Sequence, residues 1–364
     1  MAKRKHDHIL LGTIVAILVV GIAALFSASV IESQKDFGNI YSYFFHQLLF
    51  GVGIGGTLGF VAYHIPYKKW RPFALPILLL SILFLILVFI PSLSSGTTGG
   101  AKRWIELAGF SFQPSELAKL AVVIYLAAWL EARSRTVRRW NEGLVPFLVI
   151  VAIVGGLIIL QPDMGTFGVI ALTSAVMFFS SGVSFAHMGA VAALGTGLLF
   201  LLIKFEPYRM ERLTTFLDSS KDPLGMSYQI NQALLAIGSG GILGVGLGKS
   251  LQKYSFLPEP MKDSIFAVWS EEVGFVGALF LIALFVVLAL RGLKIAKNAR
   301  DSFGKFLALG ITFWIISQAF VNMASMIGLV PLTGIPLPLV SYGGSSMAVT
   351  LAGLGILLNI SKHN

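Results

Sequence analysis

The sequence lacks cysteine altogether and is poor in charged residues. None of its 364 residues is cysteine, and only 12% are Asp, Glu, Lys or Arg. The first absence excludes disulfides and thiolate metal sites. The second argues against a soluble domain, in which roughly a quarter of the residues are charged. The ten-residue segments of alternating hydrophobicity that mark an outer-membrane barrel are absent too, so a helical membrane protein is the class that remains.

Long apolar runs fill most of the chain instead. Hydrophobic residues make up 56% of it, and the mean hydropathy is +0.83. Runs long enough to cross a bilayer recur, which predicts an all-α polytopic membrane protein with about ten transmembrane helices. These form a single domain, residues 1–364. The first run is longer than the apolar part of a cleaved signal peptide, so we expect it to be retained. The predicted spans are 9–31, 44–65, 72–91, 114–131, 144–160, 165–182, 187–204, 264–290, 305–329 and 344–360.

The net charge of +10 comes largely from loops on one side of these spans. Lys and Arg accumulate in the cytoplasmic loops of membrane proteins, so both termini are predicted to be cytoplasmic. No block of Lys and Arg alternates with aromatic residues as a nucleic-acid surface requires, and no nucleic-acid partner is expected. The basic residues of this side are Lys3, Arg4, Lys5, Lys68, Lys69, Arg71, Arg133, Arg135, Arg138, Arg139, Arg291, Lys294, Lys297, Arg300, Lys305 and Lys362.

The longest loop, residues 205–263 between the seventh and eighth spans, falls on the opposite, extracytoplasmic side. Loops of more than about 15 residues are usually functional or disordered. This one mixes aromatic residues, prolines, glycines and charges, and it includes the apolar stretch 230–237. We therefore expect it to be ordered, with short helices that lie on the membrane.

Several ionisable residues fall inside or at the ends of the predicted spans. A charge at the centre of a transmembrane helix costs about 2.5–3.5 kcal/mol on insertion scales, so such residues indicate a functional site by default. Glu116 and Lys119 begin the fourth span and Asp163 lies in the turn after the fifth; simple neutralisation by ion pairing is the alternative. Asp263, before the eighth span, is either a helix N-cap or a general base with a shifted pKa. The remaining charges of this kind are Glu271 and Glu272.

Two further sets of residues on the extracytoplasmic side suit an anionic ligand. Arg side chains match phosphate oxygens, and a helix N-terminus offers unpaired amides to an anion. Solvated charge, lipid headgroup contact and plain helix capping are the alternatives. Prolines before the last span predict a shaped, re-entrant loop. The candidates are Lys102, Arg103, Arg209 and Arg212 in the loops, and Ser341, Gly343, Gly344, Ser345 and Ser346 at the start of the last span.

Seven short stretches spread over nearly the whole chain form a characteristic set. They are Lys102–Ile105, Phe112–Lys119, Gln161–Thr166, Arg212–Asp218, Ile237–Gly241, Phe256–Glu259 and Pro331–Ser346. In this order they resemble the SEDS proteins (shape, elongation, division and sporulation), bacterial enzymes that polymerise peptidoglycan from lipid II. Within the family, residues 242–253 look closer to the division (FtsW-like) branch than to the elongation (RodA-like) branch.

The resemblance implies a ten-helix peptidoglycan glycosyltransferase of the bacterial inner (plasma) membrane, with its active site on the extracytoplasmic side. Such an enzyme transfers an undecaprenyl-pyrophosphate-linked glycan to the GlcNAc 4-hydroxyl of lipid II. The implied partners are membrane lipids, a class B penicillin-binding protein (a transpeptidase), and regulators of the divisome or elongasome.

The resemblance also assigns roles to residues. The family's essential aspartate follows its Leu-Pro-Glu motif and falls on Asp263, which makes this residue the expected general base. Its neighbours Lys262 and Ser264 differ from the family's usual Thr and Phe, so the details of the pocket stay open. Lys119 is expected to pair with Asp263, supported by Glu116 and Asp163. A divalent cation, Mg²⁺ or Mn²⁺, bridging the pyrophosphate is compatible with this chemistry; its protein ligands are unknown and no organic cofactor is implied.

Two other functional classes stay open on the sequence. A transporter that flips lipid II without chemistry would use intramembrane charges and a basic outer cavity equally well, although the charges thin out in the inner half of the spans. A non-catalytic scaffold that recruits the penicillin-binding protein would tolerate the loss of Asp263.

Overall fold

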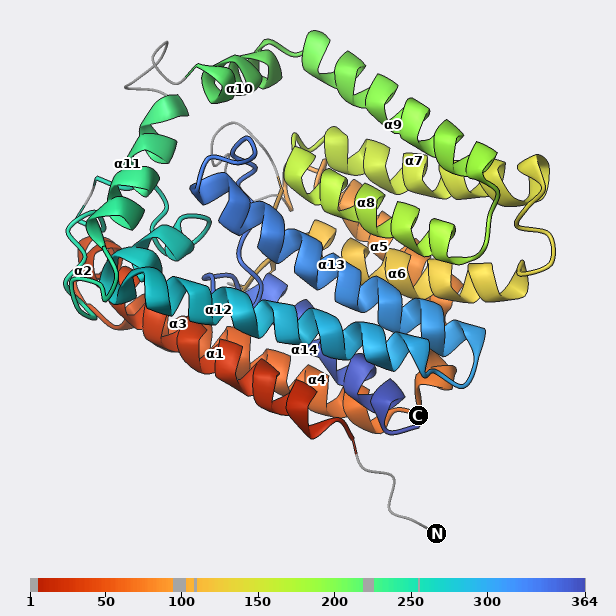
Figure 1. Ribbon diagram of the computed structural model, residues 1–364, viewed down its shortest axis with the longest axis horizontal. Helices are drawn as coiled ribbons and strands as arrows, with labels where there is room; N and C mark the ends of the chain where they lie inside the picture. Colours follow the sequence, from red (N-terminus) through yellow and green to blue (C-terminus); the bar gives the residue numbers. More distant parts are fainter. Residues whose placement is uncertain (1–5, 94–102, 108–109, 219–225, 255, 364) are drawn as a thin grey trace.

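The computed structural model describes residues 6–93, 103–107, 110–218, 226–254 and 256–363, and these fold into a helical bundle (Figure 1). Each predicted span coincides with a helix, and in the described part of the chain seven helices are long and apolar enough to cross a membrane. The multi-pass helical prediction is therefore confirmed. The spans are α1 (His8–Ala28), α3, η1 and α4 (together Ser42–His64), α5 (Ala74–Leu87), α6 (Pro114–Ala132), η3 with α7 (Trp140–Ile159), α8 (Met164–Ser180), α9 (Phe185–Lys204), α12 (Ile265–Lys297), α13 (Ser302–Met326) and α14 (Gly344–Ser361).

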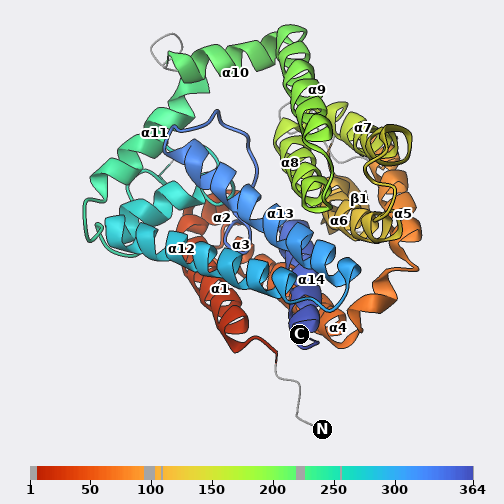
Figure 2. The same ribbon diagram turned by 45° about the vertical axis from the view of Figure 1, so that its right-hand side comes forward.

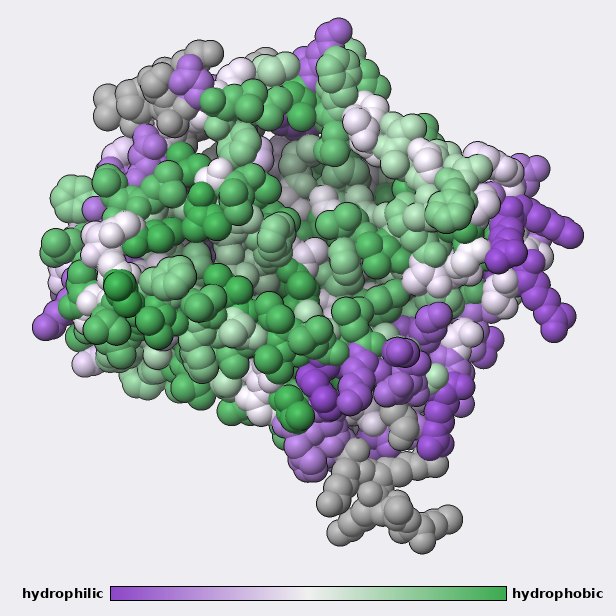
Figure 3. All heavy atoms as spheres, viewed as in Figure 1, coloured by the Kyte–Doolittle hydropathy of each residue, from purple (hydrophilic) through white to green (hydrophobic). Residues whose placement is uncertain are grey.

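The helices α13 and α14 form the centre of the bundle. Of the most apolar 18 residues of each helix, 72% are buried in α13 and 83% in α14, whereas only 6% are buried in α9. Figures 1 and 2 show α13 between α12 on one side and α8 on the other. The outer helices expose many apolar side chains, which appear green on the surface in Figure 3. This arrangement suits a lipid environment, because polar contacts concentrate inside and apolar residues face out.

Both termini lie at the same end of the bundle. The Asp7 amide donates to the Ser361 hydroxyl at 3.1 Å, and the Asp7 carboxylate pairs with Arg291 at 2.5 Å. At the same end, Lys68, between α4 and α5, pairs at 3.1 Å with Asp301, the N-cap of α13. Hydrophilic residues gather over this end in Figure 3. It matches the basic side that the sequence predicts.

The opposite end, called here the loop end, holds the long connections. It comprises α2 (Val30–Phe37), the antiparallel hairpin β1 (Ile105–Leu107) and β2 (Phe110–Phe112), α10 (Pro207–Leu217), α11 (Met226–Ser239) and the irregular segment 331–343. Loop 205–263 contains helices, as expected, and their position on the membrane stays a prediction. The helix α10 bridges α9 and α11 across the loop end (Figures 1 and 2). The hairpin was not predicted, because its strands span only three residues each.

The irregular segment 331–343 is buried inside the loop end, as the prolines predicted. Ile335, Leu337 and Leu339 are at most 4% exposed. Non-helical backbone at this depth requires protein partners. It finds them in α13, where the Gln318 amide donates to the Pro336 carbonyl at 2.9 Å.

The helix α12 is interrupted, although its sequence predicted one continuous span. The backbone leaves the helix at Gly274, where φ is 69°. The carbonyls of Glu271 and Glu272 accept hydrogen bonds from segment 241–246 at 3.0 and 2.9 Å, and amides after the break donate back to that segment at 2.9 and 3.2 Å. A Cβ at Gly244 would lie 2.2 Å from the Glu272 carbonyl oxygen. Glycine is therefore needed for the close approach that satisfies the broken helix.

Candidate functional site

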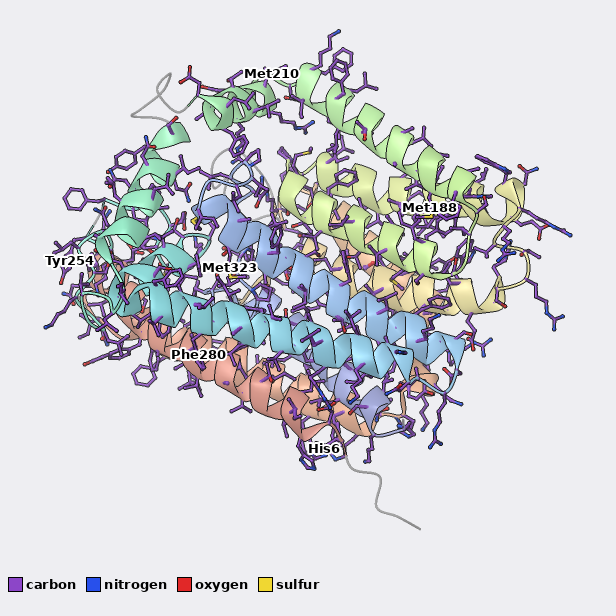
Figure 4. The ribbon with its side chains drawn as sticks, viewed as in Figure 1. His6, Met188, Met210, Tyr254, Phe280 and Met323 are labelled. Carbon is purple, nitrogen blue, oxygen red and sulfur yellow. The ribbon has the colours of Figure 1, made fainter. Side chains whose placement is uncertain are left out.

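Asp263 lies at the loop end, directly before α12. The N-cap of this helix is Ser264, whose side chain makes no capping hydrogen bond, so capping by Asp263 is not its role. Figure 4 locates the site by Met323, the residue after Asn322 on α13. Three helices, α11, α12 and α13, and segment 331–343 meet here.

The side chain and the backbone of Asp263 are held by different neighbours. The Gln229 amide of α11 donates to Oδ2 at 3.1 Å and to the Ser264 hydroxyl at 3.0 Å. The Asn322 amide of α13 donates to the Asp263 carbonyl at 2.8 Å and to the Ile335 carbonyl at 2.9 Å. The other carboxylate oxygen, Oδ1, has no hydrogen-bond partner among the described residues. One buried acceptor of a fixed carboxylate thus lacks a protein partner among the described residues and can accept a hydrogen bond from a substrate hydroxyl that reaches it.

The surroundings of Asp263 shift its proton affinity upward. Burial raises the pKa of Asp263 to about 6, with the nearby Glu259 adding to the rise, while Gln229 and Lys262 oppose it. A general base works best when its pKa lies near the operating pH. The carboxylate is therefore ionised at neutral pH and still basic enough to accept a proton.

Lys119 does not form the predicted ion pair with Asp263. Its ammonium pairs with Glu116 at 2.8 Å and donates to the Gln318 side chain at 2.6 Å, with the Trp314 ring 5.5 Å away. The lysine is 3% exposed. An ion pair three residues apart on one helix satisfies both charges locally, so Lys119 needs no partner from another helix. Lys119 is instead linked to segment 331–343 through Gln318.

Asp163 and Arg103 stabilise the turn between α7 and α8. Asp163 is the N-cap of α8 and accepts from the Thr166 amide at 3.1 Å. Arg103 donates to the carbonyls of Gln161, at 3.0 Å, and Pro162. The geometry therefore gives both residues a structural contact, and their part in catalysis or pyrophosphate binding stays a prediction. Lys102 lies outside the described residues.

Arg209 and Arg212 lie on α10, above segment 331–343. Arg209 donates to the Leu202 carbonyl at 3.1 Å, and Arg212 to the Leu332 carbonyl at 3.1 Å. Leu332 is two residues from Gly334, at which a Cβ would lie 3.9 Å from Asp263 Oδ2. The guanidinium of Arg212 is thus tied to the loop that borders the aspartate. Of the two arginines, Arg212 is the better placed for a leaving group at Asp263.

The serines and glycines before α14 serve as contacts between segments. The Ser341 hydroxyl accepts from Leu337 and donates to the Lys262 carbonyl at 2.6 Å. The Gly343 amide donates to the Gln47 side chain at 3.1 Å, and the Ser345 hydroxyl accepts from Gln113 at 3.2 Å. These groups have protein partners, and anion binding stays a prediction for them as it does for Gly344 and Ser346.

The described residues fit a divalent cation only in part. No group of three or more His, Asp or Glu side chains comes together in the described part of the chain. Mg²⁺, however, is often held by one or two carboxylates together with substrate phosphates. The free Oδ1 of Asp263 is a donor of this kind.

Three polar residues of the site escaped the sequence analysis. Gln318 and Asn322 are spaced by four within the predicted span 305–329, so they share a helix face, and an amide pair inside an apolar span is a detectable signal. Gln229 lies in the long loop. No sequence pattern connects it to Asp263, and only the packing of α11 against α12 brings the two together.

Comparison with known proteins gives the family. The model of the FtsW/RodA/SpoVE family of cell cycle proteins matches residues 8–364. Stage V sporulation protein E of Bacillus subtilis (strain 168) is 38% identical over 362 residues, which cover 100% of this chain and 98% of that protein. The probable peptidoglycan glycosyltransferase FtsW of Geobacter sulfurreducens (strain ATCC 51573 / DSM 12127 / PCA) is 39% identical over 363 residues, 99% of this chain and 96% of that protein.

Solved structures share the fold. A chain of a peptidoglycan synthase complex, solved to explain the coordination of polymerization and crosslinking, aligns with a TM-score of 0.81 at 29% identity and covers 98% of both chains. The rod shape determining protein RodA of Thermus thermophilus aligns with a TM-score of 0.72 at 30% identity, covering 98% of this chain and 96% of that one. With the family model matched over almost its whole length, the chain belongs to the FtsW/RodA/SpoVE family, the SEDS proteins, and its sequence is FtsW- and SpoVE-like.

Proposed function

We propose that this protein is a peptidoglycan glycosyltransferase that polymerises lipid II into glycan strands. The observation that carries the proposal is Asp263, a carboxylate with a pKa of about 6 and one free acceptor oxygen, held at the loop end by Gln229 and Asn322. Relatives named as peptidoglycan glycosyltransferases and a structural neighbour from a peptidoglycan synthase complex support the reaction class.

The reaction follows from these groups. Asp263 accepts the proton of the GlcNAc 4-hydroxyl of lipid II, and that oxygen attacks the anomeric carbon of the lipid-linked glycan. The bond from this carbon to the pyrophosphate oxygen breaks, and undecaprenyl pyrophosphate leaves with the electron pair. Positioned general bases typically contribute about 10²–10⁴-fold. Arg212, which is bound to Leu332 of the segment that borders the aspartate, stabilises the negative charge of the leaving group.

A bound Mg²⁺ or Mn²⁺ would supply further charge neutralisation to the pyrophosphate. Asp263 is the residue of this chain that would hold it, together with oxygens of the substrate. Gln229 holds the carboxylate of Asp263, and Asn322 holds its backbone carbonyl.

The loop end faces the extracytoplasmic side in this proposal. The Lys and Arg residues of the opposite end favour a cytoplasmic position for both termini in the bacterial plasma membrane. A class B penicillin-binding protein is the proposed partner, because a chain of similar fold comes from a synthase complex that couples polymerization with crosslinking. The identity to FtsW proteins favours a role in division over one in elongation.

Polymerisation of purified lipid II tests the proposal. The protein is assayed alone and with its cognate transpeptidase in the presence of penicillin, which blocks crosslinking. We expect long uncrosslinked glycan strands. Folded protein that yields none, even with the transpeptidase present, would shift the assignment to lipid II transport or to a scaffolding role.

The rate of polymerisation should depend on pH through Asp263. The base acts as the carboxylate, so the rate is expected to rise with pH and reach half its maximum near pH 6. The Gln229 hydrogen bond favours the ionised form, so Gln229→Ala raises the pKa of Asp263 and moves this midpoint to higher pH. Initial rates between pH 4.5 and 8.5 measure both effects. If the midpoint does not move in Gln229→Ala, the loss of rate at low pH is not caused by protonation of Asp263.

A further inference from the structure

A second polar cluster is buried in the loop end and has no part in the reaction described above. It contains one ammonium, two carboxylates and two hydroxyls, and none of these residues is more than 5% exposed. They come from α1, from segment 240–257 and from α12, and Figure 4 marks this region by Tyr254. The members are Ser27, Ser250, Lys253, Glu271 and Glu272.

Lys253 is the centre of the cluster. Its ammonium lies 2.9 Å from Glu272 Oε1, 2.7 Å from the Ser27 hydroxyl and 2.7 Å from the Gly248 carbonyl. An ammonium has three donors, and all three are used. Both side chains of the ion pair are at most 3% exposed. The ammonium is fully hydrogen-bonded, whereas Glu272 Oε2 has no partner among the described residues. Removing Lys253 would therefore leave a buried carboxylate without its counter-ion.

The two carboxylates hold segment 240–257 against α12. Glu271 accepts from the Leu251 amide at 2.9 Å and from the Ser250 hydroxyl. Glu272 accepts from the Ser250 amide at 3.3 Å, besides its bond to Lys253. The backbone hydrogen bonds across the break at Gly274 add to these side-chain contacts. The segment is therefore fixed where α12 itself is discontinuous.

The ion pair closes a loop that contains Asp263. Lys253 precedes Asp263 by ten residues and Glu272 follows it by nine, so the pair joins the two ends of the stretch 253–272. Between them Leu257 and Met261 are 2% and 3% exposed. Joining the ends of such a loop restricts the conformations open to everything within it.

The remaining contacts of this loop lie next to the aspartate. The Met261 carbonyl accepts from the Tyr342 amide at 2.8 Å, and the Lys262 carbonyl from the Ser341 hydroxyl at 2.6 Å. Segment 331–343 thus holds the middle of the loop, while the buried pair holds its ends.

We propose that Lys253 and Glu272 form a positioning staple for the catalytic aspartate. By joining the ends of loop 253–272 inside the protein, the pair keeps the Asp263 carboxylate in the geometry that proton transfer requires. This inference rests on the proposed function of Asp263 and assigns Lys253 and Glu272 no contact with substrate. A misplacement of about 1 Å in a catalytic group costs on the order of 10²-fold in rate.

Kinetics of folded variants test the staple. Lys253→Met is expected to lower kcat for lipid II polymerisation by about ten-fold or more and to leave KM within about two-fold, because binding groups on α10 are untouched. Lys253→Arg keeps the charge and should restore kcat to within about three-fold of the wild type. Asp7→Asn is the matched control, since it breaks another ion pair of α12, with Arg291 at the opposite end, and its kcat should stay unchanged.

All rates are normalised to the folded fraction, measured by thermal unfolding of the detergent-solubilised proteins. A folded Lys253→Met protein with wild-type kcat would overturn the staple. So would a loss of activity that merely follows the folded fraction, because a purely stabilising pair predicts that result.

A distance measurement separates the staple from the proposed function. The chain has no cysteine, so spin labels are attached to Phe256→Cys in the loop and Leu83→Cys on α5, both exposed positions. We expect the distance distribution to broaden in Lys253→Met and not in Asp7→Asn. An unchanged distribution refutes the staple. Absence of polymerisation by the wild type, together with broadening in Lys253→Met, refutes the glycosyltransferase instead.

Discussion

Asp263→Asn is expected to abolish glycan polymerisation while the helical bundle stays folded. The substitution keeps the size of the side chain and leaves an oxygen that accepts from Gln229, but it removes the group that takes the proton. Loss of a positioned general base costs about 10²–10⁴-fold in rate. Burial raises the pKa of the Asp263 carboxyl, which means that it disfavours the charged form of this side chain. A neutral amide of the same size does not carry that cost. The loss should therefore be one of chemistry and not of folding.

The measurement compares initial rates of strand formation from lipid II, with the folded fraction determined on the same samples. Asp36→Asn provides the matched control, because this carboxylate also lies at the loop end, on an exposed surface, and accepts from the Tyr43 hydroxyl at 2.7 Å. Its rate should equal that of the wild type. Wild-type turnover by Asp263→Asn would remove the aspartate from the mechanism and favour the scaffold or transport functions.

Lys119→Met is expected to be the most destabilising of the substitutions considered. It leaves the Glu116 carboxylate buried without its counter-ion, since both side chains of the pair are 2% exposed. Breaking a buried pair by removing one partner costs about 3–5 kcal/mol of unfolding free energy. The change also removes the donor to Gln318, which anchors Pro336 in segment 331–343. Activity should fall together with stability.

Equilibrium unfolding in mixed micelles, followed by tryptophan fluorescence, measures this effect. The double variant Lys119→Met/Glu116→Gln should recover part of the lost stability, because the orphaned charge is gone. Arg139→Met supplies the control, since it breaks a pair of the same spacing, with Glu142, on the exposed surface; such pairs contribute little. Equal losses in the buried and the exposed variant would contradict the energetic role given to the Lys119–Glu116 pair.

The sequence predicted the spans well because their signal is local. A run of about 20 apolar residues needs no knowledge of its neighbours to be recognised as membrane-spanning, and the helices of the described residues match the predicted ranges. Gly274 shows the limit of that reasoning. A single glycine is tolerated in a helix, so the span 264–290 predicted continuity, whereas segment 241–246 replaces the hydrogen bonds that the helix gives up.

The sequence likewise predicted only part of the candidate site. The position of Asp263 at the mouth of a span, and its likeness to the family's essential aspartate, were readable in the sequence. Its partners were not. Lys119 was expected beside it and pairs with Glu116 instead, while Gln229 and Asn322 arrive from distant parts of the chain.

The sequence by itself thus determined the membrane class, the approximate spans and the identity of the candidate base, since these depend on composition, period and motif. Only the tertiary structure decided which charges neutralise one another and which side chains hold the base. Those contacts join α11, α12 and α13 with segments remote in the chain, and in a low-dielectric interior the nearest available partner determines the pairing. The spacing of two residues along the sequence does not give the distance between their side chains once the chain has crossed the bundle between them.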